Sequence, residues 1–344
     1  MKSVTLVGPQ PAGSEQVARI LAQRGIKRPV ALVTAGWQER ESEDEALIAS
    51  FGVPAVNLRL HARSEELFAD SLRYAPPEGT NHASKLARDP ELSTAYKARQ
   101  ERLRHMQVFY RMRLESADDV DQAIAVRHVD DALLEEEQRV SIDILKRLDG
   151  DHLARCQRLQ DEFDARCTPE QRPSIALHRK ELAAILEPAG ALVIAGGHVA
   201  SLLNRMRLFG VLDLARHLPI IAWSAGAMVL TDRIVCFHDY PPYGKDIAQV
   251  LDSGLGVAPG VVVLPDPSHR VRMDDARGIR RFAERMAPAL CLAMDVGAEV
   301  TFEGGRIVSG QAFLLSTRGE VDRDWRGGEL VGTRPATPSA GGPA

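Results

Sequence analysis

Short apolar segments alternate with helical segments along the chain, and this alternation limits the possible folds more than any other feature of the sequence. Strands are predicted at Ser3–Val7, Pro29–Thr34, Ala55–Leu60, Ala191–Ala195, Ile220–Trp223, Val261–Leu264 and Ala289–Met294. Helices are predicted between several of them, the first from about Ser14 to Gln23. Strands and helices that alternate at this spacing favour a parallel sheet with right-handed crossovers. We therefore expect an α/β, doubly wound, mostly parallel sheet with helices on both faces.

One long block interrupts the alternation. From about Ala83 to Leu186 the strand signals vanish and the charge density rises. Apolar and small side chains recur there at three- and four-residue steps, at Leu145, Leu148, His152, Cys156, Leu159 and Phe163. A second helical pattern covers Glu101–Leu114. The block predicts a large helical insertion whose apolar stripe favours a homodimer, and His152 and Cys156 are interpreted as core or rim residues of that stripe.

The chain is accordingly divided into four predicted parts. Residues 1–82 are the N-terminal part of the α/β domain, and residues 83–186 are the helical insertion. Residues 187–326 are the C-terminal part of the α/β domain and carry the candidate site. Residues 327–344 are rich in Gly, Pro, Thr and Ser, which predicts a disordered tail.

Composition excludes several classes of protein. The 344 residues carry a formal net charge of −4 and no basic stripe, so we expect no nucleic-acid partner. No apolar run is long enough for a signal peptide or a membrane span, so we expect no membrane partner. The four cysteines lack metal-binding spacing, which predicts a reducing cytoplasm, no disulfide framework and no metal. No organic cofactor is implied.

A serine follows the strand predicted at Ile220–Trp223. Ser224 is flanked by the small residues Ala222, Ala225 and Gly226, and a helical segment follows at once. This order is typical of a nucleophile elbow, in which a strained residue raises its hydroxyl above the sheet and a helix N-terminus lies beneath it. The alternative interpretation is a serine that caps an ordinary strand-to-helix turn.

Other polar residues also follow predicted strands, and in a parallel sheet such loops open at one edge. Ser224 as nucleophile, His269 as base and Asp295 as orienting carboxylate supply the parts of a catalytic triad. Backbone N–H groups of Gly197 and Ala225 are the predicted oxyanion hole. Each residue also has a purely structural interpretation, as a strand end, a loop cap or an Asx turn.

The segment from Leu192 to about Ser309 resembles the dipeptidase E and cyanophycinase family of serine peptidases. The matching residues are Ala195-Gly196-Gly197, Ala222-Trp223-Ser224-Ala225-Gly226-Ala227, Asp239-Tyr240-Pro241, Ser268-His269 and Asp295-Val296-Gly297-Ala298. The resemblance implies a class I glutamine amidotransferase-like, flavodoxin-like fold, with Ser224 as nucleophile and His269 as base. It places the acid at Asp295, with Asp239 as the rival.

The chain departs from that family after the paired glycines. His198 stands where an amide-bearing residue is usual. We interpret it as a substrate contact beside Gly196, as an extra proton carrier, or as a loop histidine without chemistry. Arg270 and Arg272 follow the histidine and suit an acidic group of the substrate, because guanidinium binds carboxylate in a bidentate way. The helical insertion has no counterpart in the short family members.

Three functions remain to be compared. The first is a serine hydrolase that cleaves a small peptide or amide, including one with an aspartyl residue. The second is a non-catalytic scaffold whose helical insertion mediates oligomerisation or partner binding. The third, an amidotransferase, requires a cysteine on the elbow, where this chain has Ser224. We therefore set the third aside.

Overall fold

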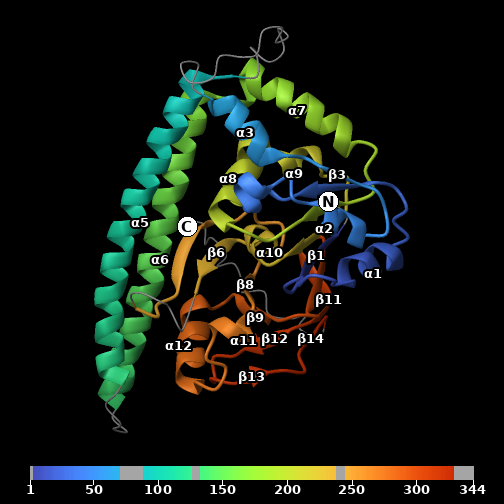
Figure 1. Cartoon of the computed structure of the whole chain (residues 1–344). Coiled ribbons are helices and arrows are strands. Elements are labelled where there is room, and N and C mark those ends of the chain that lie inside the picture. Colours follow the sequence, from blue (N-terminus) through green and yellow to red (C-terminus); the bar gives the residue numbers. More distant parts are fainter. Residues whose placement is uncertain (1–2, 70–87, 126–131, 238–244, 329–344) are drawn as a thin grey trace, which may run out of the picture.

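The computed structural model describes residues 3–69, 88–125, 132–237 and 245–328. A mixed α/β body built around a large central sheet is flanked by two long antiparallel helices (Figure 1). Of the tail predicted at 327–344, residues 329–344 lie outside the described residues, as does the rival acid Asp239, whereas Gly327 belongs to a strand.

The central sheet has eight strands in the order β14-β11-β10-β1-β5-β4-β2-β3. Their bounds are β1 (Val4–Val7), β2 (Val30–Val33), β3 (Ala55–Asn57), β4 (Leu192–Ile194), β5 (Ile220–Trp223), β10 (Glu299–Glu303), β11 (Arg306–Gln311) and β14 (Arg326–Gly327). Five neighbouring strands, β1, β5, β4, β2 and β3, pair in parallel. Beyond β1, the strands β10, β11 and β14 continue the sheet in antiparallel pairing. The predicted parallel α/β core is confirmed in this part.

The flavodoxin-like detail of the prediction is not confirmed. In a flavodoxin-like sheet the first strand lies between the second and the third, in the order 2-1-3-4-5. Here β1 lies beyond β5 and pairs with β5 on one side and β10 on the other. The five parallel strands therefore run β3-β2-β4-β5-β1.

A second, four-stranded sheet corrects the expectation of a single sheet. It contains β8 (Val261–Pro265), β9 (Leu290–Met294), β12 (Phe313–Leu315) and β13 (Val321–Asp322), in the order β13-β12-β9-β8. A separate ribbon pairs β6 (Arg233–Cys236) with β7 (Gln249–Ser253). The apolar runs predicted strands at β8 and β9, but such a run does not specify the strand with which it pairs.

Helices cover both faces of the central sheet. They are α1 (Gln16–Gln23), α2 (Glu45–Ser50), α3 (Leu60–Phe68), α7 (Pro173–Leu186), α8 (Val199–Phe209), α9 (Val211–Leu214) and α10 (Ala225–Val229), with 3-10 turns η1 (Ala35–Arg40) and η2 (Pro169–Gln171). Two further helices, α11 (Pro267–Arg270) and α12 (Ala276–Met286), follow β8, and α12 packs on the second sheet. Successive strand residues face opposite sides. Leu32 and Ile221 therefore pack with α1 and α2, whereas Val33 and Ile194 pack with α3 and α8.

The predicted helical insertion is a hairpin of α5 (Pro90–Ala125) and α6 (Ala132–Cys167), each 36 residues long (Figure 1). One face of the hairpin packs against β7 and α12, and its Tyr110, Leu114, Ile142 and Leu145 belong to one buried apolar cluster with residues of β8 and β9. The predicted stripe residues His152, Cys156, Leu159 and Phe163 are all buried. The hairpin is thus attached along one side of the body.

A buried ion pair anchors the hairpin to α12. Arg285 donates from Nε and Nη2 to the two carboxylate oxygens of Asp149 on α6, at 2.8 and 2.7 Å. The Tyr110 hydroxyl donates to the same carboxylate at 2.7 Å. Burial and this neighbouring carboxylate raise the pKa of Tyr110 above its usual value, so the hydroxyl stays protonated. One turn earlier on α12, Arg281 pairs with Asp118 at 3.0 Å.

Candidate functional site

Ser224 adopts the backbone conformation that a nucleophile elbow requires. Buried strand β5 ends at Trp223, and Ser224 follows with φ 50° and ψ −122° immediately before α10. A positive φ is strained for a residue with a Cβ, and such strain gathers at functional turns. The small residues around it are needed, because a Cβ on Gly226 would lie 2.5 Å from the Ile194 carbonyl oxygen. The plain helix-cap alternative lacks support, since the Ser224 side chain makes no capping hydrogen bond.

The paired glycines after β4 lie directly against this serine. A Cβ on Gly196 would stand 2.9 Å from the Ser224 Cβ. Gly197 has φ +121°, and a Cβ there would lie 2.5 Å from the Gly36 carbonyl. Both positions therefore require glycine, and the close approach brings the loop backbone to the elbow. Ala225 is the first residue of α10, so its N–H has no carbonyl partner within the helix. The oxyanion-hole role of Gly197 and Ala225 stays a prediction.

His198 has a structural role in this arrangement. Its Nδ1 accepts a hydrogen bond from the Ser201 backbone N–H at 3.2 Å, so the side chain caps the N-terminus of α8. Its own backbone N–H donates to the Gly36 carbonyl at 2.7 Å. The loop-histidine interpretation accounts for these contacts, and a contact of His198 with substrate stays a prediction.

The sequence analysis did not identify Gln38, whose side chain bonds Ser201, the same residue that His198 contacts. Gln38 in η1 has φ 58° and ψ −124°, a strained backbone close to that of Ser224. Its side-chain amide donates to the Ser201 hydroxyl at 2.9 Å. No motif in the sequence marks this position, because its conformation and its hydrogen bond depend on the packing of η1 beside α8.

His269 has a carboxylate partner that the sequence analysis did not name. Its Nδ1 lies 2.7 Å from the Asp266 Oδ1, within the short turn that begins α11. The hydrogen bond to Asp266, and then the charges of Asp266 and Asp295, raise the pKa of His269. The imidazole is 81% exposed, so its other edge is open to an incoming group. In the sequence, the only sign of this pair is an aspartate three residues before the histidine.

Asp295, the predicted acid, bonds elsewhere. Its carboxylate accepts a hydrogen bond from the Ser268 hydroxyl and another from the Val296 N–H at 2.9 Å. The structure thus brings Asp295 next to the residue that precedes His269, while the carboxylate bonded to the imidazole belongs to Asp266. Asp239 cannot be compared, since it falls between the described segments.

The two sheets meet close to the elbow. Strand β1 pairs with β5, and Val7 lies opposite Trp223. The next residue, Gly8, donates from its N–H to the Ala298 carbonyl at 2.9 Å, and a Cβ on it would overlap the Asp295 carbonyl oxygen. The Asp295 turn therefore lies about two strand spacings, or ~10 Å, from the elbow. The described residues show no hydrogen bond between Ser224 and His269, a contact that often tightens only when substrate binds.

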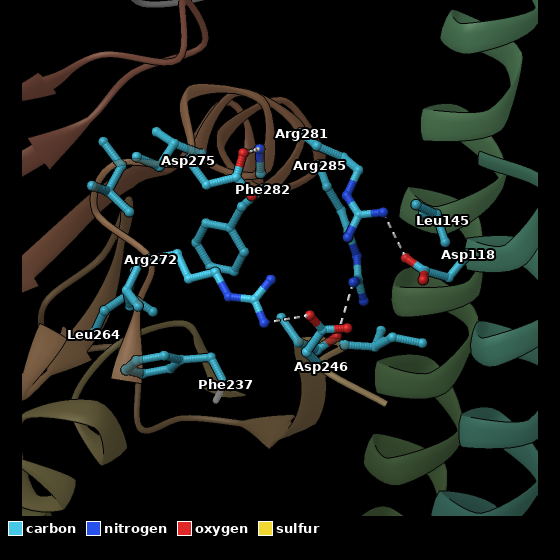
Figure 2. Close-up of a pocket in the computed structure, with 16 residues that line it drawn as sticks. Asp118, Leu145, Phe237, Asp246, Leu264, Arg272, Asp275, Arg281, Phe282 and Arg285 are labelled. Carbon is cyan, nitrogen blue, oxygen red and sulfur yellow. Dashed lines mark hydrogen bonds and ion pairs between the residues drawn. The ribbon is translucent and has the colours of Figure 1, made fainter. Parts of the chain in front are cut away.

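The predicted substrate arginines lie at the end of α11 and just after it. Arg270 lies 3.8 Å from the second oxygen of Asp266, and Arg272 lies 3.6 Å from Asp246. Arg272 also lines a cavity of about 90 Å³ with Phe237 and Phe282 (Figure 2). Both guanidinium groups are thus near carboxylates, and Arg270 shares Asp266 with His269.

Neither a metal site nor a membrane span is found in the described segments. No group of three or more His, Cys, Asp or Glu side chains among them is placed to hold a metal ion. None of their helices is both long and apolar enough to cross a bilayer.

Two buried cysteines are poor candidates for a nucleophile. Burial raises the pKa of the Cys156 and Cys291 thiols to about 12, which keeps these thiols protonated and weakly nucleophilic.

Comparison with known proteins leaves the family open. No protein-family model matches the chain, and no curated protein matches it. A solved structure of a peptidase from an acI-B1 Actinobacterium is 12% identical over 95% of this chain and 93% of that one, with a TM-score of 0.44. A likeness at this level supports no statement about activity. Membership of the dipeptidase E and cyanophycinase family therefore stays an expectation.

Proposed function

We propose that this protein is a serine hydrolase that cleaves a small peptide or amide, including substrates with an aspartyl residue. The observation that carries the proposal is the strained Ser224 between β5 and α10, with the Gly196 backbone packed against it. A strained serine at the carboxyl end of a buried parallel strand is costly, and in hydrolases that strain exposes the hydroxyl for attack.

The proposed reaction uses groups from three loops. Ser224 Oγ attacks the carbonyl carbon while His269 Nε2 takes its proton, and Asp266 at Nδ1 fixes the tautomer and stabilises the imidazolium. The oxyanion accepts hydrogen bonds from the Gly197 and Ala225 N–H groups. Collapse expels the amine, which receives the proton from His269, and water then hydrolyses the acyl-enzyme. Arg270, beside Asp266, suits an acidic substrate group.

The first test compares wild type with Ser224→Ala on a panel of Asp-containing dipeptides and β-aspartyl peptides. We expect turnover that falls roughly 10³-fold or more in Ser224→Ala. Ser50→Ala is the matched control, since that hydroxyl only bonds the Leu47 carbonyl of its own helix. Equal turnover in Ser224→Ala would exclude the serine mechanism. Absence of turnover by wild type would exclude aspartyl peptides as substrates.

We also propose that the hairpin mediates self-association. Ten large apolar side chains are exposed in the described segments, and seven of them lie on α5 and α6: Val108, Phe109, Met112, Val120, Leu133, Val140 and Ile144. By helical periodicity those on α5 project away from the buried Tyr110 and Leu114. An apolar stripe of this kind on a helical pair favours a protein partner.

The partner proposed for this stripe is a second copy of this chain, because a twofold axis would bring two identical apolar faces together. Arg104 precedes Met112 on α5 and Asp119 follows it, and each already has an exposed partner within the chain, Glu101 and Lys245 respectively. Two α5 helices crossing antiparallel near Met112 would place Arg104 of each near Asp119 of the other. A twofold interface requires this kind of self-complementarity.

A further inference from the structure

A large cavity lies on the side of the molecule where the base of the hairpin meets α8. It encloses about 800 Å³ and is lined by residues of α5, α6, α7, α8 and α9 and by the turn after β7. The lining includes Tyr96, Arg99, Phe163, Arg179, Asn204 and Arg207. Cavities of this size are in the range that holds small molecules.

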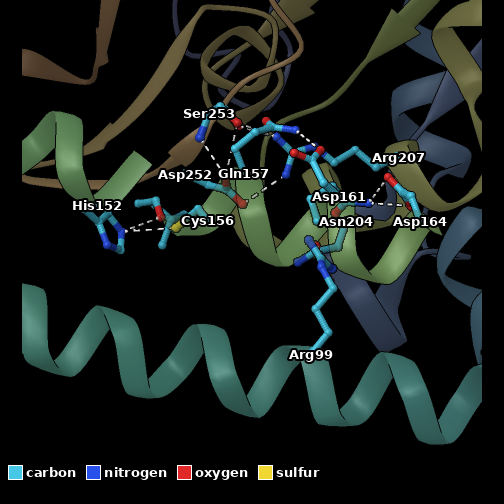
Figure 3. Close-up of polar contacts among 12 residues, drawn as sticks. Arg99, His152, Cys156, Gln157, Asp161, Asp164, Asn204, Arg207, Asp252 and Ser253 are labelled. Carbon is cyan, nitrogen blue, oxygen red and sulfur yellow. Dashed lines mark hydrogen bonds and ion pairs between the residues drawn. The ribbon is translucent and has the colours of Figure 1, made fainter. Parts of the chain in front are cut away.

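Arg99 is the unusual residue in this wall. Its side chain reaches from α5 toward Asn204, as Figure 3 shows, and Nη1 lies 3.4 Å from the Asn204 Oδ1. The residue is only 5% exposed, and its Nε and Nη2 atoms are buried without a hydrogen-bond partner in the described structure. In the described segments no carboxylate lies within ion-pair distance of it.

The acidic side chains nearest to Arg99 are already engaged. Asp252 accepts from Arg207 Nη1 at 3.0 Å, and Asp164 accepts twice from the Gln160 amide, at 2.9 and 2.8 Å. The Phe163 ring centroid lies 5.6 Å from the Arg99 Cζ, which offers only a weak cation–π contact. Burial lowers the pKa of Arg99, yet an arginine keeps its charge in proteins. A buried charge without a partner is costly, and an anion would relieve that cost.

We propose that this cavity binds a small anionic molecule through Arg99, by a carboxylate or a phosphate group. Acidic side chains also line the cavity, at Asp164, Glu170, Asp213 and Asp232. They disfavour a polyanion, so the ligand is expected to carry one anionic group and hydrogen-bond donors elsewhere. The cavity and the candidate hydrolase site share one element, because Asn204 and Arg207 belong to α8, which begins just after Gly196-Gly197. Binding of the anion does not require the hydrolase activity.

The test measures binding of inorganic phosphate and of acetate to the full chain by calorimetry, at ionic strength matched with NaCl. We expect saturable binding of at least one probe, and the probe that binds identifies the anionic group. In Arg99→Met the affinity should fall at least about tenfold. Arg102→Met is the control, because Arg102 lies one turn away, is 57% exposed and pairs with Glu162.

A second variant keeps the test decisive if Arg99→Met does not fold. Asn204→Asp would place a carboxylate beside the Arg99 Nη1, so the anion should lose its site while the protein stays folded and melts at a higher temperature. Failure of wild type to bind either probe saturably, or unchanged affinity in Asn204→Asp, would overturn the proposal.

Discussion

At the scale of single residues, His269 is controlled by the carboxylate three positions before it. Asp266 bonds its Nδ1 and raises its pKa, and a general base must be neutral to accept a proton. Activity should therefore fall as the pH falls through this raised pKa. Asp266→Asn removes the charge and the correct tautomer, so we expect the acid limb of the kcat/KM profile to move to lower pH and kcat to fall by about 10²–10⁴-fold.

Asp295→Asn is the matched comparison for that experiment. Asp295 affects the pKa of His269 only through its charge and bonds Ser268 instead. We expect a smaller displacement of the acid limb than in Asp266→Asn. A larger displacement in Asp295→Asn would identify Asp295 as the orienting acid, as the sequence analysis predicted, and would contradict the role proposed for Asp266.

At the scale of elements, the ion pair between α6 and α12 governs how firmly the hairpin is attached. Asp149 and Arg285 are 2% and 5% exposed, so removal of one partner leaves a buried charge uncompensated. Asp149→Ala should lower the free energy of unfolding by about 3–5 kcal/mol, measured by urea denaturation. The double variant Asp149→Leu with Arg285→Met should recover most of that loss.

Glu162→Ala is the control for the attachment of the hairpin. The Arg102–Glu162 pair also involves both long helices, but its side chains are each 57% exposed. Loss of such an exposed pair should change the free energy of unfolding by about 0–1 kcal/mol. Similar effects of Asp149→Ala and Glu162→Ala would show that the buried pair does not anchor the hairpin.

At the scale of the whole molecule, the outer face of the hairpin should set the oligomeric state. Sedimentation velocity of wild type should show a dimer, and the double variant Phe109→Glu with Met112→Glu should sediment as a monomer, because the charges would be buried in the interface. Val308→Glu is the control, since Val308 is similarly exposed but lies on β11. A wild type that stays monomeric at ~100 μM would exclude a stable dimer and leave the stripe to another partner.

Much of the architecture could be predicted from local sequence patterns. The apolar runs predicted β1, β2, β4 and β5 close to their observed bounds, and the stripe from Leu145 to Phe163 predicted a long helix in the insertion. The small residues around Ser224 predicted a strained turn, which the structure has. These features follow from interactions within a few residues, such as side-chain periodicity and the space that a tight turn allows.

Other features depend on contacts between distant segments. Leu264 and Cys291 are apolar enough for the central sheet, but β8 and β9 pair with each other in a second sheet. Asp295 follows β9 as expected, yet its carboxylate points to Ser268 and leaves His269 to Asp266. Arg99 reads as one more charged residue of a helix, and only its burial beside Asn204 distinguishes it.

The sequence by itself therefore determined the types of element, their order and the strained serine turn. The tertiary structure alone decided which strands are neighbours, which carboxylate meets the imidazole and which arginine is left without a partner. The physical reason is that periodicity shows which side of an element is buried, whereas the partner on that side is chosen by packing of the whole chain.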